Sequence, residues 1–132
     1  IIVSMNHWLS GWIDWNIVLD RDGGPNHAGN YCGAPIMIDT ASGEVYYTPV
    51  FYVLAQLSRT IRPGDRVVQV TQAIDMCQDS VYATATINDQ GLLSVQVLNT
   101  DINEAECYLQ IGGQCVDLSI DANSLQTVRI QL

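Results

Sequence analysis

Lysine is absent from this chain of 132 residues, and only five arginines stand against fourteen acidic side chains. The formal net charge is therefore −9 at pH 7. A surface this acidic repels phosphate backbones, which argues against a nucleic-acid partner. The same acidity suits work at low pH, where part of the carboxylates are protonated, and it equally suits a protein that needs charge only for solubility.

Long apolar runs are missing as well, although 48% of the residues are hydrophobic. Without a run of eighteen or more apolar residues we expect no transmembrane segment, and contact with a membrane surface is left open. The length and composition predict a globular protein with about one domain's worth of chain. Because the sequence opens on an apolar run at Ile1, with neither an initiator Met nor signal-peptide architecture, we expect a piece of a longer protein.

Metal-ligand spacing is absent too, since the chain has no Cys-x-x-Cys pair and no histidine cluster. Zinc is therefore not expected, and His7 and His27 are interpreted as surface or polar-network residues. An Asn-x-Ser/Thr sequon is also lacking, so glycosylation gives no support for secretion.

Four cysteines leave the question of disulfides open. Cys107 and Cys115 flank an apolar/polar alternation that contains Gly-Gly, which is typical of a β-hairpin. We predict a disulfide between them, provided that the register places them nearly opposite. Cys32 and Cys77 form a second bridge or stay as buried thiols.

Indoles, amides and a carboxylate gather between residues 11 and 36, around a Gly-rich turn. Trp offers a sugar ring a stacking face and one N–H donor, Asn offers a donor and an acceptor, and Asp offers acceptors. This composition predicts sugar binding. The alternative is that the tryptophans are core residues of a buried strand and that Asn30 only caps a loop. The segment contains Gly-Trp-Ile-Asp-Trp-Asn at 11–16, Asp-Gly-Gly-Pro-Asn at 22–26 and Asn-Tyr-Cys-Gly-Ala-Pro-Ile at 30–36.

The first half of the chain reads as alternating strands and helices. Residues 1–12 place apolar side chains on one helical face, and residues 12–19 read as a strand that is apolar on both faces, as a covered parallel strand is. Such a strand needs neighbours that this chain does not contain. A functional loop over 20–34 should follow its carboxyl end. The remaining predicted elements are β segments at 35–39 and 44–47, around a turn at 40–43, and a helix over 48–61 that Pro63 and Gly64 stop.

After residue 64 the pattern changes to short strands that are rich in β-branched residues and separated by turn signals. This spacing predicts an antiparallel sandwich and a domain division near residue 64. The predicted strands are 66–71, 80–87, 92–98, a hairpin over 107–118, and 126–132.

The segment at 11–36 closely resembles the glucosylceramidase family of retaining β-glycosidases, which combine a TIM barrel with an attached β-sandwich. The resemblance continues through Tyr-Tyr at 46–47, Phe-Tyr-Val-Leu at 51–54, Leu-Ser at 57–58 and Ile-Arg-Pro-Gly at 61–64. It implies that residues 1–64 are the C-terminal part of a (β/α)8 barrel, from the end of its helix 7 to its helix 8. Residues 65–132 would then form the β-sandwich.

The resemblance also implies roles for individual residues. Trp15 and Asn30 match positions that line the glucose subsite, and Tyr31 matches an aromatic position beside them. Asp14 is the acidic residue that lies within the apolar strand, and we place it among the substrate-binding residues. Ile13 replaces a Thr that is usual in relatives, and Cys32 with Gly33 departs from bulkier or charged residues, which puts the aglycone side in doubt more than the sugar side.

Catalysis itself is expected outside this chain. A retaining glycosidase needs two carboxyl groups about 5–5.5 Å apart, and the acidic residues of the first half form no convincing pair. In the family, both catalytic glutamates lie at the ends of upstream barrel strands.

The resemblance implies the C-terminal part of an enzyme of sphingolipid metabolism that hydrolyses β-glucosides such as glucosylceramide. The N-terminal remainder of the enzyme would be its partner, no cofactor would be needed, and the location would be lysosomal or extracellular. The alternative is a non-catalytic relative with a structural or carbohydrate-binding role.

Overall fold

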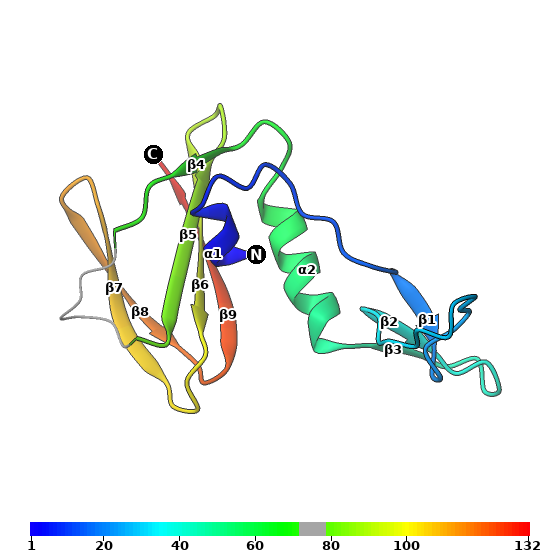
Figure 1. Cartoon of the computed structure of the whole chain (residues 1–132). Coiled ribbons are helices and arrows are strands. Elements are labelled where there is room, and N and C mark those ends of the chain that lie inside the picture. The colour runs from blue at the N-terminus through cyan, green and yellow to red at the C-terminus, as the bar shows by residue number, and fades with distance from the viewer. Residues whose placement is uncertain (72–78) are drawn as a thin grey trace. The chain divides into compact units, whose positions relative to one another are not determined.

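The computed structural model describes residues 1–71 and 79–132 and divides the chain into two compact units. The sandwich unit comprises Ile1–Ser10 with Thr60–Leu132, and the loop unit comprises Gly11–Arg59. Figure 1 labels their elements. In chain order these are α1 (Ile2–Met5), β1 (Val18–Asp20), β2 (Ile36–Ile38), β3 (Val45–Tyr47), α2 (Pro49–Thr60), β4 (Arg66–Val68), β5 (Val81–Ile87), β6 (Leu92–Asn99), β7 (Ala105–Ile111), β8 (Gln114–Ile120) and β9 (Ser124–Gln131).

A small three-stranded sheet in the order β1-β2-β3 organises the loop unit. β1 and β2 run parallel, whereas β2 and β3 form an antiparallel hairpin. The turn of this hairpin is closed by Asp39, whose Oδ1 accepts the backbone N–H of Ala41 at 2.9 Å and that of Ser42 at 3.3 Å. The two predicted β segments around the turn at 40–43 are confirmed.

The predicted strand at 12–19 is wrong over most of its length, since β1 covers only Val18–Asp20. The side chains before it are open to solvent, with Ile13 97% and Ile17 73% exposed. β1 is the outer strand of its sheet, so β2 is its one hydrogen-bonded neighbour among the described residues. A parallel strand forms only where a neighbouring strand offers backbone partners, and residues 12–17 pair with no strand among the described residues.

The helix α2 confirms the predicted helix over 48–61. Pro49 occupies the first helical position, where a missing N–H costs nothing. The hydroxyl of Thr48 donates to the carbonyl of Pro35 at 3.0 Å and ties the start of the helix to the small sheet. The apolar stripe of α2 is only partly covered, because Leu57 is 6% exposed but Val50 is 49% exposed.

The first ten residues belong to the sandwich unit rather than to the loop unit. The helix there is shorter than the predicted face over 1–12, since α1 ends at Met5 and Trp8 has a positive φ of 67°. Ile2 and Met5 are buried, and the side-chain amide of Asn6 donates to the carbonyl of Ala83 in β5 at 2.8 Å.

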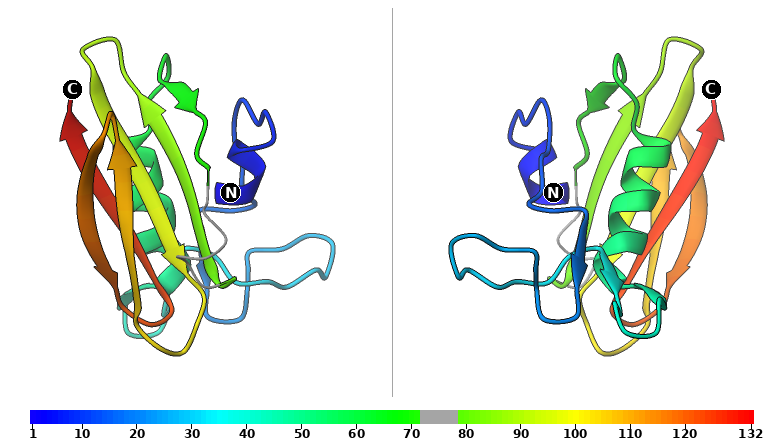
Figure 2. Two further views of the ribbon diagram at one scale, coloured as in Figure 1. Left: turned by 90° about the vertical axis from the view of Figure 1, so that its left-hand side faces the viewer. Right: turned by 90° about the vertical axis from the view of Figure 1, so that its right-hand side faces the viewer.

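The antiparallel sandwich is confirmed, with a four-stranded sheet in the order β4-β5-β6-β9 and a β7-β8 hairpin. Figure 2 shows the hairpin in front of the four-stranded sheet in its left view. The period of two along each strand points alternate side chains inward, and their apolar atoms form one core between the two layers. The buried members of this core are Val81, Ala85, Leu93, Val95, Val97, Ala105, Leu118 and Ile120.

Asn99, at the end of β6, is a buried polar anchor of the sandwich with 0% exposure. Its Nδ2 donates to the carbonyls of Asn103, Ile120 and Asp121 at 2.8, 3.2 and 3.1 Å, and its Oδ1 accepts the N–H of Asp101 at 2.9 Å. One side chain therefore satisfies the backbone where three segments of the sandwich meet.

Replacing Asn99 by Ala is expected to lower the free energy of unfolding by about 2–4 kcal/mol, because buried backbone groups lose their partners and a cavity remains. Urea unfolding of the complete protein followed by circular dichroism measures the loss. Gln90→Ala in the exposed β5–β6 turn serves as the control. A loss as small as that of the control would show that water replaces the amide without cost.

The predicted Cys107–Cys115 disulfide is wrong, since Cys115 carries a free thiol. The hairpin register pairs Cys107 with Leu118 and Cys115 with Gln110. Positions 107 and 110 are three apart on one strand and point to opposite faces of the hairpin. The side chains of the two cysteines therefore cannot meet, although the hairpin itself was predicted correctly.

For the second pair, Cys32 also carries a free thiol and is half-buried. Its predicted partner, Cys77, lies outside the described residues.

Candidate functional site

The loop over residues 21–35 leaves the carboxyl end of β1 and begins with a turn that the Asp20 side chain closes. Asp20 Oδ1 accepts the backbone N–H of Asp22 at 3.0 Å and that of Gly24 at 2.7 Å. The backbone N–H of Asp20 donates to the carbonyl of Gly24 at 2.6 Å. A carboxylate with two backbone donors is a loop cap, and it fixes the chain at the base of the loop.

Gly23 makes the base of the loop compact, because its backbone lies against the returning chain. It has a φ of +84°, and a Cβ built on it would lie 2.7 Å from the carbonyl oxygen of Cys32 and 3.2 Å from Cβ of Tyr31. Only glycine fits both the conformation and the space. The contact brings Tyr31 next to the turn at the carboxyl end of β1.

Asn26 closes a second turn within the loop. Its Oδ1 accepts the N–H of Ala28 at 2.8 Å and that of Asn30 at 3.1 Å, and its Nδ2 donates a short hydrogen bond to the carbonyl of Asn30. The sequence placed Asn26 in a sugar-binding motif but gave it no role of its own. The signal that could have identified it is the tendency of Asn to bond the backbone two residues on.

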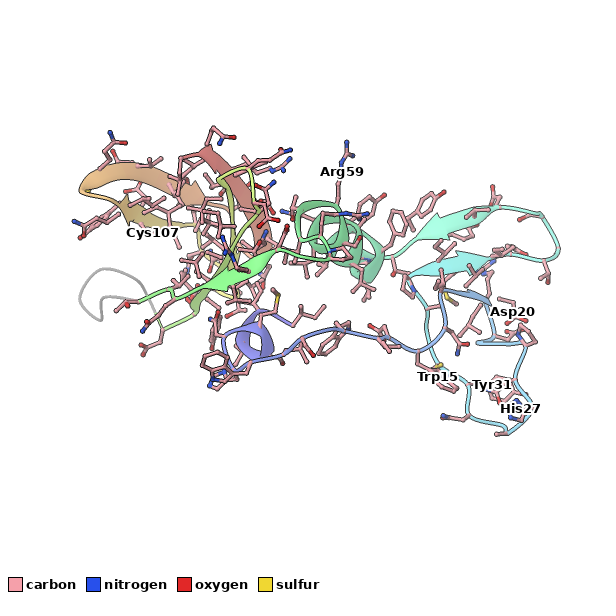
Figure 3. The ribbon with its side chains drawn as sticks, turned by 90° about the horizontal axis from the view of Figure 1, so that it is seen from above. Trp15, Asp20, His27, Tyr31, Arg59 and Cys107 are labelled. Carbon is pink, nitrogen blue, oxygen red and sulfur yellow. The ribbon has the colours of Figure 1, made fainter. Side chains whose placement is uncertain are left out.

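The predicted sugar-binding residues present their side chains to solvent. Trp15 is 72% and Tyr31 63% exposed, and Asn30 is also exposed. Figure 3 labels Trp15, Tyr31 and His27 toward one end of the loop unit. Trp15 precedes β1, whereas Asn30 and Tyr31 lie in the loop that follows it. Trp12, at the start of the same segment, is 49% exposed.

Asp14 is an exposed residue, and its Oδ1 accepts the backbone N–H of Trp15 at 2.8 Å. This bond joins the two residues locally. Burial of Asp14 in an apolar strand is not seen, because residues 12–17 form no strand.

An ion pair ties the loop to the small sheet. Arg21 Nη1 lies 2.8 Å from Asp39 Oδ2, and its guanidinium carbon lies 6.0 Å from the centre of the Tyr46 ring. The backbone N–H of Ala41 and the Arg21 guanidinium both hold the pKa of the Asp39 carboxyl below its ordinary value. The bond to Asp39 in turn raises the pKa of Arg21.

Tyr46 completes this cluster by donating its hydroxyl hydrogen bond to Glu44. Because the bond holds the proton, it raises the pKa of Tyr46. Arg21, Met37 and Tyr46 line a shallow, open depression. Asp39 and Glu44 are thus engaged in structural contacts at the surface, and nothing in their arrangement suggests an acid/base pair.

Within residues 1–71 and 79–132, no group of three or more His, Cys, Asp or Glu side chains is placed to hold a metal ion. The helices of this part of the chain are all too short or too polar to cross a membrane.

The comparisons with known proteins agree on one family. Residues 1–61 match the glycosyl hydrolase family 30 TIM-barrel domain. A Caenorhabditis elegans protein named as a glucosylceramidase is 42% identical over 130 residues, which cover 97% of this chain and 24% of that protein. The lysosomal acid glucosylceramidase of Mus musculus is 32% identical over 99 residues, 75% of this chain and 19% of that enzyme.

The fold agrees with a solved structure as well. SrfJ from Salmonella typhimurium matches with a TM-score of 0.88 and 27% identity, over 99% of this chain and 29% of SrfJ. The architecture is therefore the last strand and helix of a TIM barrel followed by an antiparallel β-sandwich. Two curated relatives match 97% of this chain. The chain in turn spans about a quarter of the length of each. It belongs to the glucosylceramidase-like members of glycosyl hydrolase family 30.

Proposed function

We propose that this chain is the C-terminal part of a retaining β-glycosidase that hydrolyses β-glucosides such as glucosylceramide. Residues 1–64 would complete the barrel, and residues 65–132 would form the attached sandwich. Trp15, Asn30 and Tyr31, with Asp14 beside them, would line the subsite of the sugar whose bond is cleaved. The reaction is a double displacement through a covalent glycosyl–enzyme intermediate, with both catalytic carboxyl groups supplied by the rest of the enzyme.

The observation that carries this proposal is the loop at the carboxyl end of β1. In TIM-barrel enzymes the loops at this end of the strands build the active site. Here the loop is held by side-chain hydrogen bonds and a glycine contact, yet it exposes an amide and an aromatic ring. A rigid loop with exposed polar and aromatic groups is suited to orient a sugar, since little ordering remains to be done on binding.

The partners follow from the same proposal. The N-terminal remainder of the enzyme would cover the exposed side chains of Ile13 and Ile17. The substrate would be a β-glucoside or glycolipid. No cofactor is required by the chemistry. The location would be lysosomal or extracellular, and the name of the mouse relative, a lysosomal enzyme, supports the first of these. A glycolipid substrate would also bring the enzyme to a membrane surface.

The proposal is tested on the complete enzyme with a fluorogenic β-glucoside and a 2-deoxy-2-fluoro glucoside that traps the intermediate. We expect hydrolysis with retention of the anomeric configuration and one covalent sugar per molecule, attached upstream of this chain. Nuclear magnetic resonance of the first product and peptide mapping measure the two results. Sugar binding without turnover or adduct would favour the non-catalytic alternative.

A further inference from the structure

Asn26 reaches across the 21–35 loop and holds both polar backbone groups of Asn30, its N–H and its carbonyl. We propose that Asn26 is a positioning residue, which sets the direction of the Asn30 side chain toward the sugar. This inference rests on the proposed function, because it gives Asn30 its role in the sugar subsite.

The geometry of the Asn26 amide explains how one side chain can hold the backbone of Asn30. The carbonyl oxygen of the Asn26 amide accepts the N–H groups of Ala28 and Asn30, while the NH₂ group of the same planar amide donates to the carbonyl of Asn30. With its N–H and carbonyl both held, the backbone of Asn30 has little freedom to rotate. Its Cα–Cβ bond, and hence the reach of its own amide, is then fixed.

Apart from the hydrogen bonds of Asn26, local packing does little to hold the backbone of Asn30 in place. Residues 27–31 are exposed, whereas Asn26 itself is half-buried. Gly29, between the two bonded N–H groups, has a φ of +67° and open space around it. Without Asn26 the exposed backbone would bond to water, and the loop tip would sample several conformations.

The β5–β6 turn offers a matched control. Asn88 Oδ1 accepts the N–H of Gln90 at 2.9 Å and that of Leu92 at 2.9 Å. The spacing, to residues two and four positions on, is the same as for Asn26. Of the two residues that Asn88 holds, Leu92 is an apolar strand residue of the sandwich. Removing the Asn88 side chain therefore breaks the same kind of turn without touching the proposed sugar subsite.

The experiment compares Asn26→Ala, Asn30→Ala, the double variant and Asn88→Ala in the complete enzyme. Rates are measured with a fluorogenic β-glucoside and normalised to active sites that a covalent inhibitor titrates. We expect Asn26→Ala to lower kcat/KM by about 10- to 100-fold, as misplacing a substrate-orienting group does. Asn88→Ala should lower Tm but leave kcat/KM per active site unchanged.

The double variant gives the decisive result. If Asn26 acts through Asn30, the double variant should fall within about twofold of Asn30→Ala alone, because the second change removes nothing more. Losses that multiply would overturn the inference, as would an unchanged kcat/KM in Asn26→Ala. An unchanged kcat/KM in Asn30→Ala would overturn the proposed subsite together with this inference, so the two failures are distinguishable.

Asn26→Asp keeps the test valid if Asn26→Ala does not fold. The carboxylate retains both acceptor bonds but cannot donate to the carbonyl of Asn30. Its second oxygen would face that carbonyl and repel it, so we expect a loss of kcat/KM that Asn30→Ala again absorbs in the double variant. A loss that adds to that of Asn30→Ala would contradict the positioning role.

Discussion

Replacing Asn30 by Ala in the complete enzyme is expected to lower kcat/KM by about 10- to 1000-fold, which is the cost of one or two polar contacts at a desolvated site. The hydrogen bonds from this amide should strengthen as the sugar ring flattens toward an oxocarbenium-like transition state. The chain itself should fold, because the Asn30 side chain is exposed in a loop. Trp15→Phe, which keeps a stacking ring but loses the indole N–H, should lower kcat/KM within the same range.

The measurement is steady-state hydrolysis of a soluble β-glucoside, normalised to titrated active sites. If Trp15 were only core filler and Asn30 only a loop cap, the variants would lose stability and keep their turnover per folded molecule. A kcat/KM of Asn30→Ala equal to that of the parent enzyme would remove Asn30 from the sugar subsite.

The second large effect concerns residues 1–132 as an isolated chain, which we expect not to fold as a single cooperative monomer. The loop unit exposes Ile13 at 97% and Ile17 at 73%, and Val50 of α2 is 49% exposed. This apolar surface suits barrel neighbours, and without them it drives association. The sandwich unit differs, because it has a core of its own.

Size-exclusion chromatography, thermal unfolding and hydrogen exchange of the purified chain check this expectation. We expect aggregation or broad unfolding, with slow exchange confined to β5 and β6 of the sandwich. A monodisperse monomer with one sharp transition and protected amides in β1 and β2 would contradict it.

The sequence predicts most elements that local patterns determine. The β-branched alternation after residue 64 identified every strand of the sandwich that the structure describes, and the i, i+3, i+4 spacing identified α2. The extent of the strand predicted at 12–19 was wrong, since the length of a parallel strand depends on its partners as well as on its own sequence.

The disulfide error has a more specific cause. A two-residue turn at Gly112 and Gly113 pairs Ile111 with Gln114, and the register then places Leu118 opposite Cys107. A bridge between Cys107 and Cys115 would need another register, so the Gly-Gly turn and the bridge exclude each other. Within the candidate site, the sequence shows which side chains could bind a sugar. The hydrogen bonds of Asn26 to Asn30 depend on distances that only the folded loop defines.

The pairing of β6 has a consequence for how the protein is made. One edge of β6 joins β5 in a tight hairpin, but the other edge joins β9 along its whole length, from Leu92 with Gln131 to Asn99 with Ser124. During synthesis the hairpin emerges from the ribosome first, and β6 then waits with an open edge until β9 follows. An open edge on an apolar strand is a template for pairing with other chains, so the nascent sandwich is exposed to misassembly until β9 emerges.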